Sequence, residues 1–101
     1  MKVVIKRVGS YPEVAEIEND LDVFQKIVGG QIVCVSTIKN IVIVCNKEGR
    51  PYGDLELNML FYGGPIYGDA FFCVKNGEDF GSLSDEDVEF LSISMWPIFT
   101  N

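Results

Sequence analysis

Five stretches of the chain have the apolar pattern of β-strands, rich in valine and isoleucine. Two of them, residues 31–36 and 40–45, are apolar at nearly every position, which is typical of strands that are covered on both faces or central in a sheet. The others alternate more weakly between apolar and polar residues. A short return at 79–81 follows the last one after an Asn-Gly turn. The five predicted strands are residues 2–8, 13–18, 31–36, 40–45 and 68–74.

Two further stretches have the spacing of amphipathic helices. In the first, residues 20–28, the helix is capped by Asn19 or Asp20 and ends at Gly29-Gly30. The second, residues 84–95, opens at a Ser84 cap, with Asp87 at the third helical position as in a capping box. We therefore predict a single α+β domain over residues 1–101. It consists of a small antiparallel or mixed sheet with two helices packed on one face.

Residues 46–67 interrupt this regular pattern. Glycines stand at 49, 53, 63 and 64, and only residues 55–60 have a pattern that fits one helical turn. Loops of this length inside a small domain are usually functional or disordered. Disorder is disfavoured because the segment is rich in leucine and aromatic residues.

Charge and composition narrow the classes of function. The net charge is −7, and residues 51–101 hold one basic residue, Lys75, against nine acidic ones. This balance disfavours binding to DNA or RNA phosphates. The chain has no histidine, which excludes Ser-His-Asp and Cys-His catalysis and the usual zinc sites. We expect a binding protein rather than an enzyme, with no cofactor and no bound metal.

The cysteines and the apolar runs indicate the compartment. Cys34, Cys45 and Cys73 lie inside apolar strands without metal-type spacing, so we expect reduced, buried thiols. No apolar run approaches the roughly 20 residues that span a bilayer, and the N-terminus lacks the pattern of a signal peptide. These features predict a cytoplasmic protein without membrane contact.

Several short motifs occur in an order that resembles a known family. They are VGG at 28–30, VCNKEG at 44–49, the isolated Asn58, YGDAFFCV at 67–74 and SLSDEDVEFL at 82–91. The family consists of small, mostly uncharacterised proteins of phages, plasmids and other mobile elements, defined as a domain of unknown function. The resemblance covers roughly residues 3–91, and the hydrophobic end SISMWPIFTN at 92–101 has no match in it.

The resemblance implies a context rather than a reaction. Small acidic phage proteins without catalytic motifs are often counter-defence factors. Some sequester a bacterial immune signal, such as a cyclic ADP-ribose isomer or a cyclic oligonucleotide, and others inhibit a host protein by contact.

The 46–67 segment holds the residue types that a nucleotide-derived signal requires. Cations hold phosphate, amides read base or ribose edges, and aromatic rings stack on bases. We therefore predict a site that binds such a signal without cleaving it. If the protein is phage-encoded, it would act in the cytoplasm of the host cell. The predicted ligand-binding residues are Asn46, Lys47, Arg50, Tyr52, Asn58, Tyr62 and Tyr67.

Alternative interpretations of the same residues stay open. The segment 46–49 is also a good polar turn, and its residues then serve only as scaffold. A protein-binding inhibitor would use the acidic half of the chain, as a mimic of DNA. A phosphodiesterase would hold a metal ion with Glu48 and either Asp54 or Glu56. We further expect a homodimer or higher homo-oligomer, sealed partly by Met95, Trp96, Ile98 and Phe99.

Overall fold

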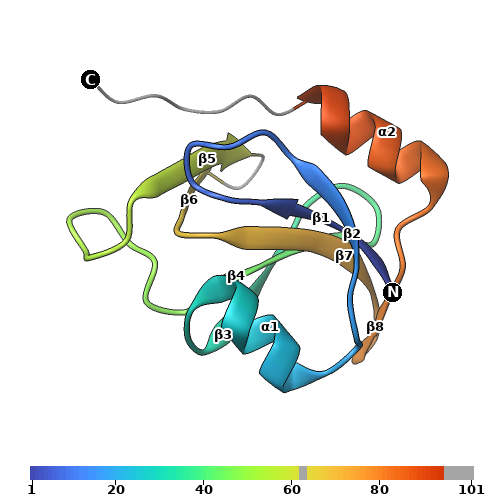
Figure 1. Cartoon of the computed structure of the whole chain (residues 1–101), viewed down its shortest axis with the longest axis horizontal. Coiled ribbons are helices and arrows are strands. Elements are labelled where there is room, and N and C mark those ends of the chain that lie inside the picture. The colour runs from blue at the N-terminus through green and yellow to red at the C-terminus, as the bar shows by residue number, and fades with distance from the viewer. Residues whose placement is uncertain (62–63, 95–101) are drawn as a thin grey trace.

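A computed structural model describes residues 1–61 and 64–94 of the chain (Figure 1). Within these residues the chain forms eight strands and two helices. In chain order they are β1 (Lys2–Lys6), β2 (Glu13–Glu16), α1 (Leu21–Val28), β3 (Ile32–Ser36), β4 (Ile41–Asn46), β5 (Leu57–Phe61), β6 (Gly64–Tyr67), β7 (Ala70–Asn76), β8 (Asp79–Gly81) and α2 (Asp85–Ser94).

The main sheet is built around β7. Its strand order is β2-β1-β7-β4-β3, and β8 pairs with the second half of β7 while β1 pairs with the first half. Neighbouring strands run antiparallel, with Val4 opposite Phe72 and Ile43 also opposite Phe72 on the other side. The predicted α+β fold with an antiparallel sheet is confirmed.

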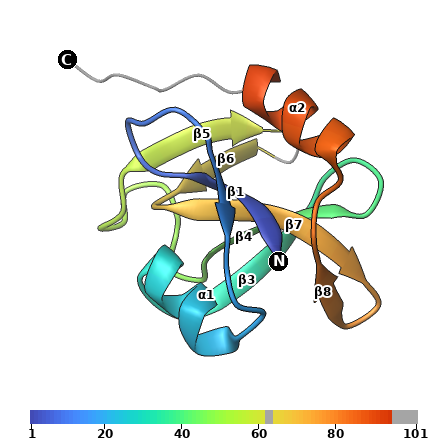
Figure 2. The same cartoon turned by 45° about the vertical axis from the view of Figure 1, so that its right-hand side comes forward.

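The helices lie on opposite faces of this sheet, so the predicted packing of both on one face is wrong. Phe24 and Val28 of α1 pack with Val42, Val44 and their neighbours on one face. Leu91 of α2 packs on the other face, and Figure 2 shows the two helices on either side of the strands. The physical reason is that all six residues of β4 are buried, which requires cover on both faces.

Helix α1 has the ends that the sequence predicts. Asp20 is the N-cap and accepts a hydrogen bond of 2.7 Å from the backbone N–H of Asp22. Gly29 follows the helix with φ of 81°, a left-handed conformation that glycine adopts without steric cost. The Phe24 ring lies 5.1 Å from the Phe71 ring, centroid to centroid, which fixes the helix on the sheet.

Helix α2 begins as predicted at a Ser84 cap. The Ser84 hydroxyl accepts a hydrogen bond of 3.1 Å from the backbone N–H of Asp87. The Lys2 ammonium forms an ion pair with Asp85. Because negative side chains stabilise helix N-termini, the acidic first turn of α2 is accounted for by helix-end electrostatics.

A hairpin of β5 and β6 adds cover to the face that carries α2. Met59, Phe61 and Ile66 point from the hairpin into the core, and the Phe61 ring lies 5.1 Å from the Phe72 ring. The prediction of an irregular segment through residue 67, with a helical turn at 55–60, is therefore wrong for this part. Residues 57–61 pair instead with 64–67 through an antiparallel register.

The three cysteines are free. Cys45 and Cys73 are buried as predicted, whereas Cys34 is half-buried, since it lies on the edge strand β3. Burial raises the pKa of the Cys73 thiol to about 12, with a smaller contribution from Cys34.

No helix among residues 1–61 and 64–94 is long and apolar enough to cross a membrane. Met95, Trp96, Ile98 and Phe99, which the sequence assigns to an oligomer interface, lie outside the described residues.

Candidate functional site

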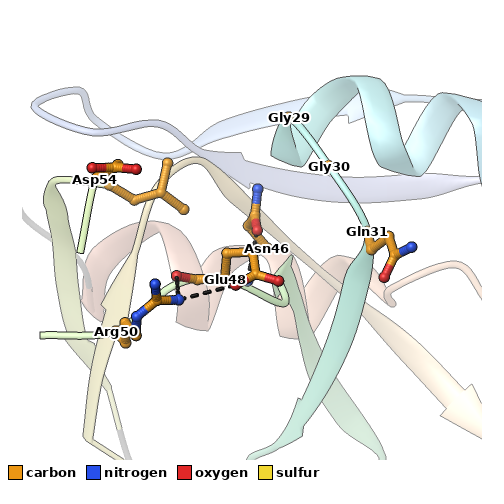
Figure 3. A pocket seen from close by; sticks show the side chains of 8 residues that line it. Gly29, Gly30, Gln31, Asn46, Glu48, Arg50 and Asp54 are labelled. Carbon is orange, nitrogen blue, oxygen red and sulfur yellow. Dashed lines mark hydrogen bonds and ion pairs between the residues drawn. The ribbon is translucent and has the colours of Figure 1, made fainter.

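A pocket of about 290 Å³ lies where α1 ends, β3 begins and β4 runs into the following loop (Figure 3). Its walls come from two stretches that are separated in sequence, residues 29–31 and 46–55, so the fold assembles it. The lining residues are Gly29, Gly30, Gln31, Asn46, Glu48, Arg50, Asp54 and Leu55.

Asn46 holds these segments together. Its side-chain amide donates to the carbonyl of Val28 at 3.1 Å, and its side-chain oxygen accepts from the backbone N–H of Glu48 at 2.8 Å. The second bond closes an Asx turn that starts the loop. Asn46 therefore satisfies a carbonyl at the end of α1 and shapes the loop at the same time.

Gly30 leaves the room that this contact needs. A Cβ atom on Gly30 would lie 2.9 Å from the side-chain nitrogen of Asn46, closer than real Cβ contacts. Any larger residue at position 30 would displace the amide from Val28. The Gly-Gly pair after α1 thus serves two purposes: Gly29 ends the helix, and Gly30 admits Asn46.

Charged side chains form one wall of the pocket. The Arg50 guanidinium lies 2.9 Å from the Glu48 carboxylate and 3.3 Å from the Glu48 carbonyl, and both side chains are exposed. An exposed ion pair of this kind contributes only about 0–1 kcal/mol. Arg50 can therefore exchange Glu48 for a ligand anion at little cost. Asp54 lines the pocket as well. The pocket therefore offers a ligand one guanidinium and two carboxylates.

A second, more open hollow of about 390 Å³ adjoins the first. The two share Gly29, Asp54 and Leu55 as lining residues, and the second extends to Lys26 and Asp69. Together they form a trough beside the C-terminal end of α1. This trough can hold a larger ligand than the first pocket can hold alone.

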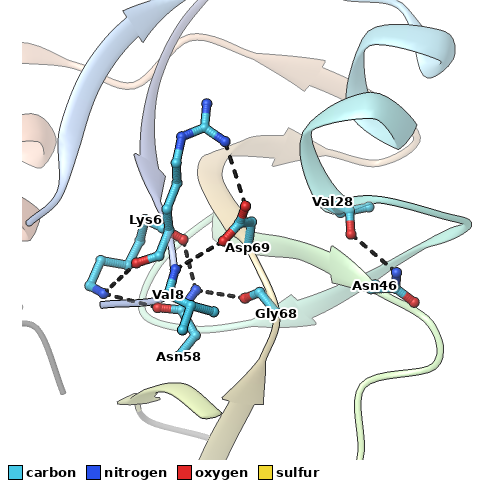
Figure 4. Close-up of polar contacts among 8 residues, drawn as sticks. Lys6, Val8, Val28, Asn46, Asn58, Gly68 and Asp69 are labelled. Carbon is cyan, nitrogen blue, oxygen red and sulfur yellow. Dashed lines mark hydrogen bonds and ion pairs between the residues drawn. The ribbon is translucent and has the colours of Figure 1, made fainter. Parts of the chain in front are cut away.

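A buried polar network lies elsewhere, between β1 and the β5–β6 hairpin (Figure 4). Lys6 and Asn58 are both fully buried, and the Lys6 ammonium donates to the Asn58 side-chain oxygen at 2.9 Å. The Asn58 amide donates to the carbonyls of Lys6 and Gly68, each at 2.7 Å. Burial lowers the pKa of the Lys6 ammonium, and the nearby Asp69 carboxylate opposes this shift. Every polar atom of the Asn58 side chain is used inside the protein.

The predicted ligand-binding residues are only partly brought together. Asn46 and Arg50 line the same pocket. Asn58 lies in the buried network instead, where it has no free group for a ligand. Tyr67 is half-buried beneath Gly49.

The other predicted residues do not line the pocket. Lys47 and Tyr52 are exposed beside it, and Tyr62 lies outside the described residues. Sequence reasoning missed Gln31 as a lining residue and considered Glu48 and Asp54 only as metal ligands. A signal for Gln31 was available in the sequence, because this residue directly follows the Gly29-Gly30 pair that ends a helix.

The carboxylates that the sequence offers for a metal ion lie around the two pockets. Within the described residues, no group of three or more Asp, Glu, Cys or His side chains is arranged to hold a metal ion. Glu48 and Asp54 line the first pocket, whereas Asp54 and Glu56 line the second hollow.

Comparison with known proteins gives one assignment. No curated protein and no solved structure matches the chain. The model of one family, a domain of unknown function named DUF3846, matches residues 1–95 and so covers the sheet, both helices and the pocket. The protein belongs to the DUF3846 family.

Proposed function

We propose that the protein binds a small nucleotide-derived ligand, without cleaving it, in the pocket at the C-terminal end of α1. The observation that carries this proposal is the convergence of Arg50, Glu48 and Asp54 on one pocket whose shape is fixed by Asn46. Sites for small molecules combine a concave surface with a few polar groups that fix orientation.

The mixture of charges suits a ligand that has both phosphate and hydrogen-bond donors. Arg50 would hold a phosphate oxygen pair in the bidentate geometry of a guanidinium. The Glu48 and Asp54 carboxylates would accept hydrogen bonds from ribose hydroxyls or base amino groups, as acidic residues do in dinucleotide sites. Gln31 adds an amide that both donates and accepts.

A simple anion fits this pocket less well. The pocket contains two carboxylates. It also lies at the C-terminus of α1, which carries a partial negative charge. Inorganic phosphate alone would meet more repulsion than attraction. A nucleoside phosphate offsets the repulsion through its ribose and base contacts.

The biological role in this proposal is sequestration of an immune signal. It rests on the resemblance to small proteins of phages and mobile elements, since some small acidic phage proteins sequester such signals. A cyclic ADP-ribose isomer and a cyclic oligonucleotide are the two ligand types to test first, since each has the phosphates, riboses and bases that the pocket would read.

Isothermal titration with cyclic ADP-ribose and with a cyclic dinucleotide tests the proposal. Arg50→Ala should weaken binding by about 10- to 100-fold, which corresponds to the 1.5–3 kcal/mol of a charge-assisted hydrogen bond. Lys47→Ala is the matched control, because it removes an exposed cation next to the pocket that does not line it. It should change affinity by less than about three-fold.

The fate of the ligand separates binding from catalysis. Heating the complex should release the ligand intact, as judged by mass spectrometry. Equal affinity in wild type and Arg50→Ala would contradict the proposed site. Recovery of a hydrolysed product would contradict sequestration and favour the phosphodiesterase.

A further inference from the structure

We propose that β3 is a dimerisation edge, which pairs antiparallel with β3 of a second copy and joins two main sheets into one. β3 is the last strand of the order β2-β1-β7-β4-β3. Among the described residues, β4 and α1 pack most closely against it, and β4 is the only strand with which it pairs.

The direction of the backbone groups follows from two hydrogen bonds at the ends of the β3–β4 pair. The Lys47 N–H donates to the Gln31 carbonyl at 2.8 Å, and the Thr37 N–H donates to the Ile41 carbonyl at 3.1 Å. Because hydrogen-bonded positions alternate along an antiparallel strand, residues 31, 33, 35 and 37 face β4. The N–H and C=O groups of residues 32, 34 and 36 therefore point outward, and in the described part of the chain no protein group bonds to them.

The charges of the two sheet edges indicate which one accepts a partner. Residues 31–37 contain no charged side chain, in a chain of net charge −7 whose copies repel each other over most of their surface. The opposite edge, β2, carries Glu13 and Glu16, both exposed. Charged side chains on an edge strand prevent pairing with other strands. β3 lacks this protection, and its Val33 side chain is 43% exposed.

The outward groups also determine the register. When the two-fold axis passes beside Cys34, residue 34 faces its own copy and Ile32 faces Ser36 of the second copy, so all outward groups of both strands are paired. A shift of the axis by one residue in either direction leaves outward groups unpaired. In the favoured register Val33 lies across from Val35 of the second copy, a pairing of β-branched side chains that stabilises sheets.

The molar mass of the protein, measured by light scattering as it elutes from a size-exclusion column, tests the interface with matched variants. At about 100 µM, wild type should have twice the 11.3 kDa mass of one chain. Val33→Lys should weaken dimerisation at least ten-fold, because it places an ammonium group against Val35 of the second copy. Val14→Lys makes the same change at a side chain that is 50% exposed on the opposite edge, and it should remain dimeric.

Mild oxidation tests the register without relying on a destabilising variant. Directly opposed residues in a hydrogen-bonded antiparallel pair have Cα atoms about 5.5 Å apart. This separation lies within the roughly 4.4–6.8 Å that a disulfide spans. Cys34 is half-buried whereas Cys45 and Cys73 are buried, so wild type should form a covalent dimer and Cys34→Ser should not.

Each outcome decides between the alternatives. A monomeric wild type would overturn the second copy as the occupant and leave the edge to a strand of another protein. A dimer that Val33→Lys leaves intact would overturn β3 as the interface. A covalent dimer that also forms in Cys34→Ser, or that is absent from wild type, would overturn the register.

Discussion

Replacing Asn58 by alanine should destabilise the protein strongly. Asn58 and Lys6 are both fully buried, and the asparagine side chain makes three hydrogen bonds to Lys6 and Gly68. In Asn58→Ala two backbone carbonyls each lose one donor, and the buried ammonium keeps one acceptor, the Arg7 carbonyl at 3.0 Å.

The magnitude follows from the kinds of hydrogen bond lost. Each amide-to-carbonyl bond contributes about 1 kcal/mol, and a bond to a charged group about 1.5–3 kcal/mol. The free energy of unfolding should therefore fall by about 3.5–5 kcal/mol, out of the roughly 5–15 kcal/mol that is typical of a domain. Urea denaturation followed by circular dichroism measures this difference.

A matched control separates burial from the chemistry of the substitution. Asn40 donates to the Asn76 side chain at 3.0 Å on the surface, so Asn40→Ala should cost less than about 1 kcal/mol. Equal losses in the two variants would refute the reasoning. In a Lys6→Met background the loss from Asn58→Ala should be smaller by about 1.5–3 kcal/mol, because no ammonium group is left without its partner.

The remaining predictions concern the pocket wall and the thiols. Gly30→Ala should lower the free energy of unfolding by about 1–2 kcal/mol through displacement of Asn46, and the same change in an Asn46→Ala background should cost clearly less; equal costs would mean that the contact is not responsible. The free energy of unfolding should decline as the pH rises above 9. In the unfolded chain the Cys73 thiol has its ordinary pKa of 9.0, whereas in the folded protein its pKa is about 12, so between these pH values only the unfolded chain loses the proton. The stability that the protonated thiol provides is thus fully present below pH 9 and is lost toward pH 12, so Cys73→Ala should flatten the decline seen in urea titrations at several pH values. With a thiol reagent in native buffer, Cys34 should react well before Cys73, and simultaneous reaction would show that the core opens as a unit.

Local signals in the sequence predict most of the elements. Both helices begin at the expected caps, Asp20 and Ser84, because a capping side chain acts on backbone groups two or three residues away. The prediction of both helices on one face is wrong, although the sequence contains the information for the correct placement. A strand buried at every residue, as in β4, needs cover on both faces, and two helices on one face cannot provide it.

The polar residues were harder to predict because their partners are distant in sequence. Lys6 follows Val4 on the inward face of β1, and a lysine at such a position requires a buried acceptor opposite. That acceptor, Asn58, is 52 residues away, and its interpretation as a ligand-binding residue did not consider this pairing. The pocket follows the same rule: Asn46 and Arg50 were identified within one loop, whereas Gln31 reaches the pocket from another segment.

The central place of β7 has a consequence for the order in which the protein folds. Synthesis produces β1 with β2, and then β3 with β4, as two antiparallel pairs with no strand between them. The strand that joins them, β7, begins only at Ala70. Until it is made, the inner edges of β1 and β4 are open, and long-range pairings of this kind form slowly. A nascent or truncated chain that ends before Ala70 would hold two half-sheets with exposed apolar edges, so aggregation should be most severe at that length and should subside once residues 70–74 are present.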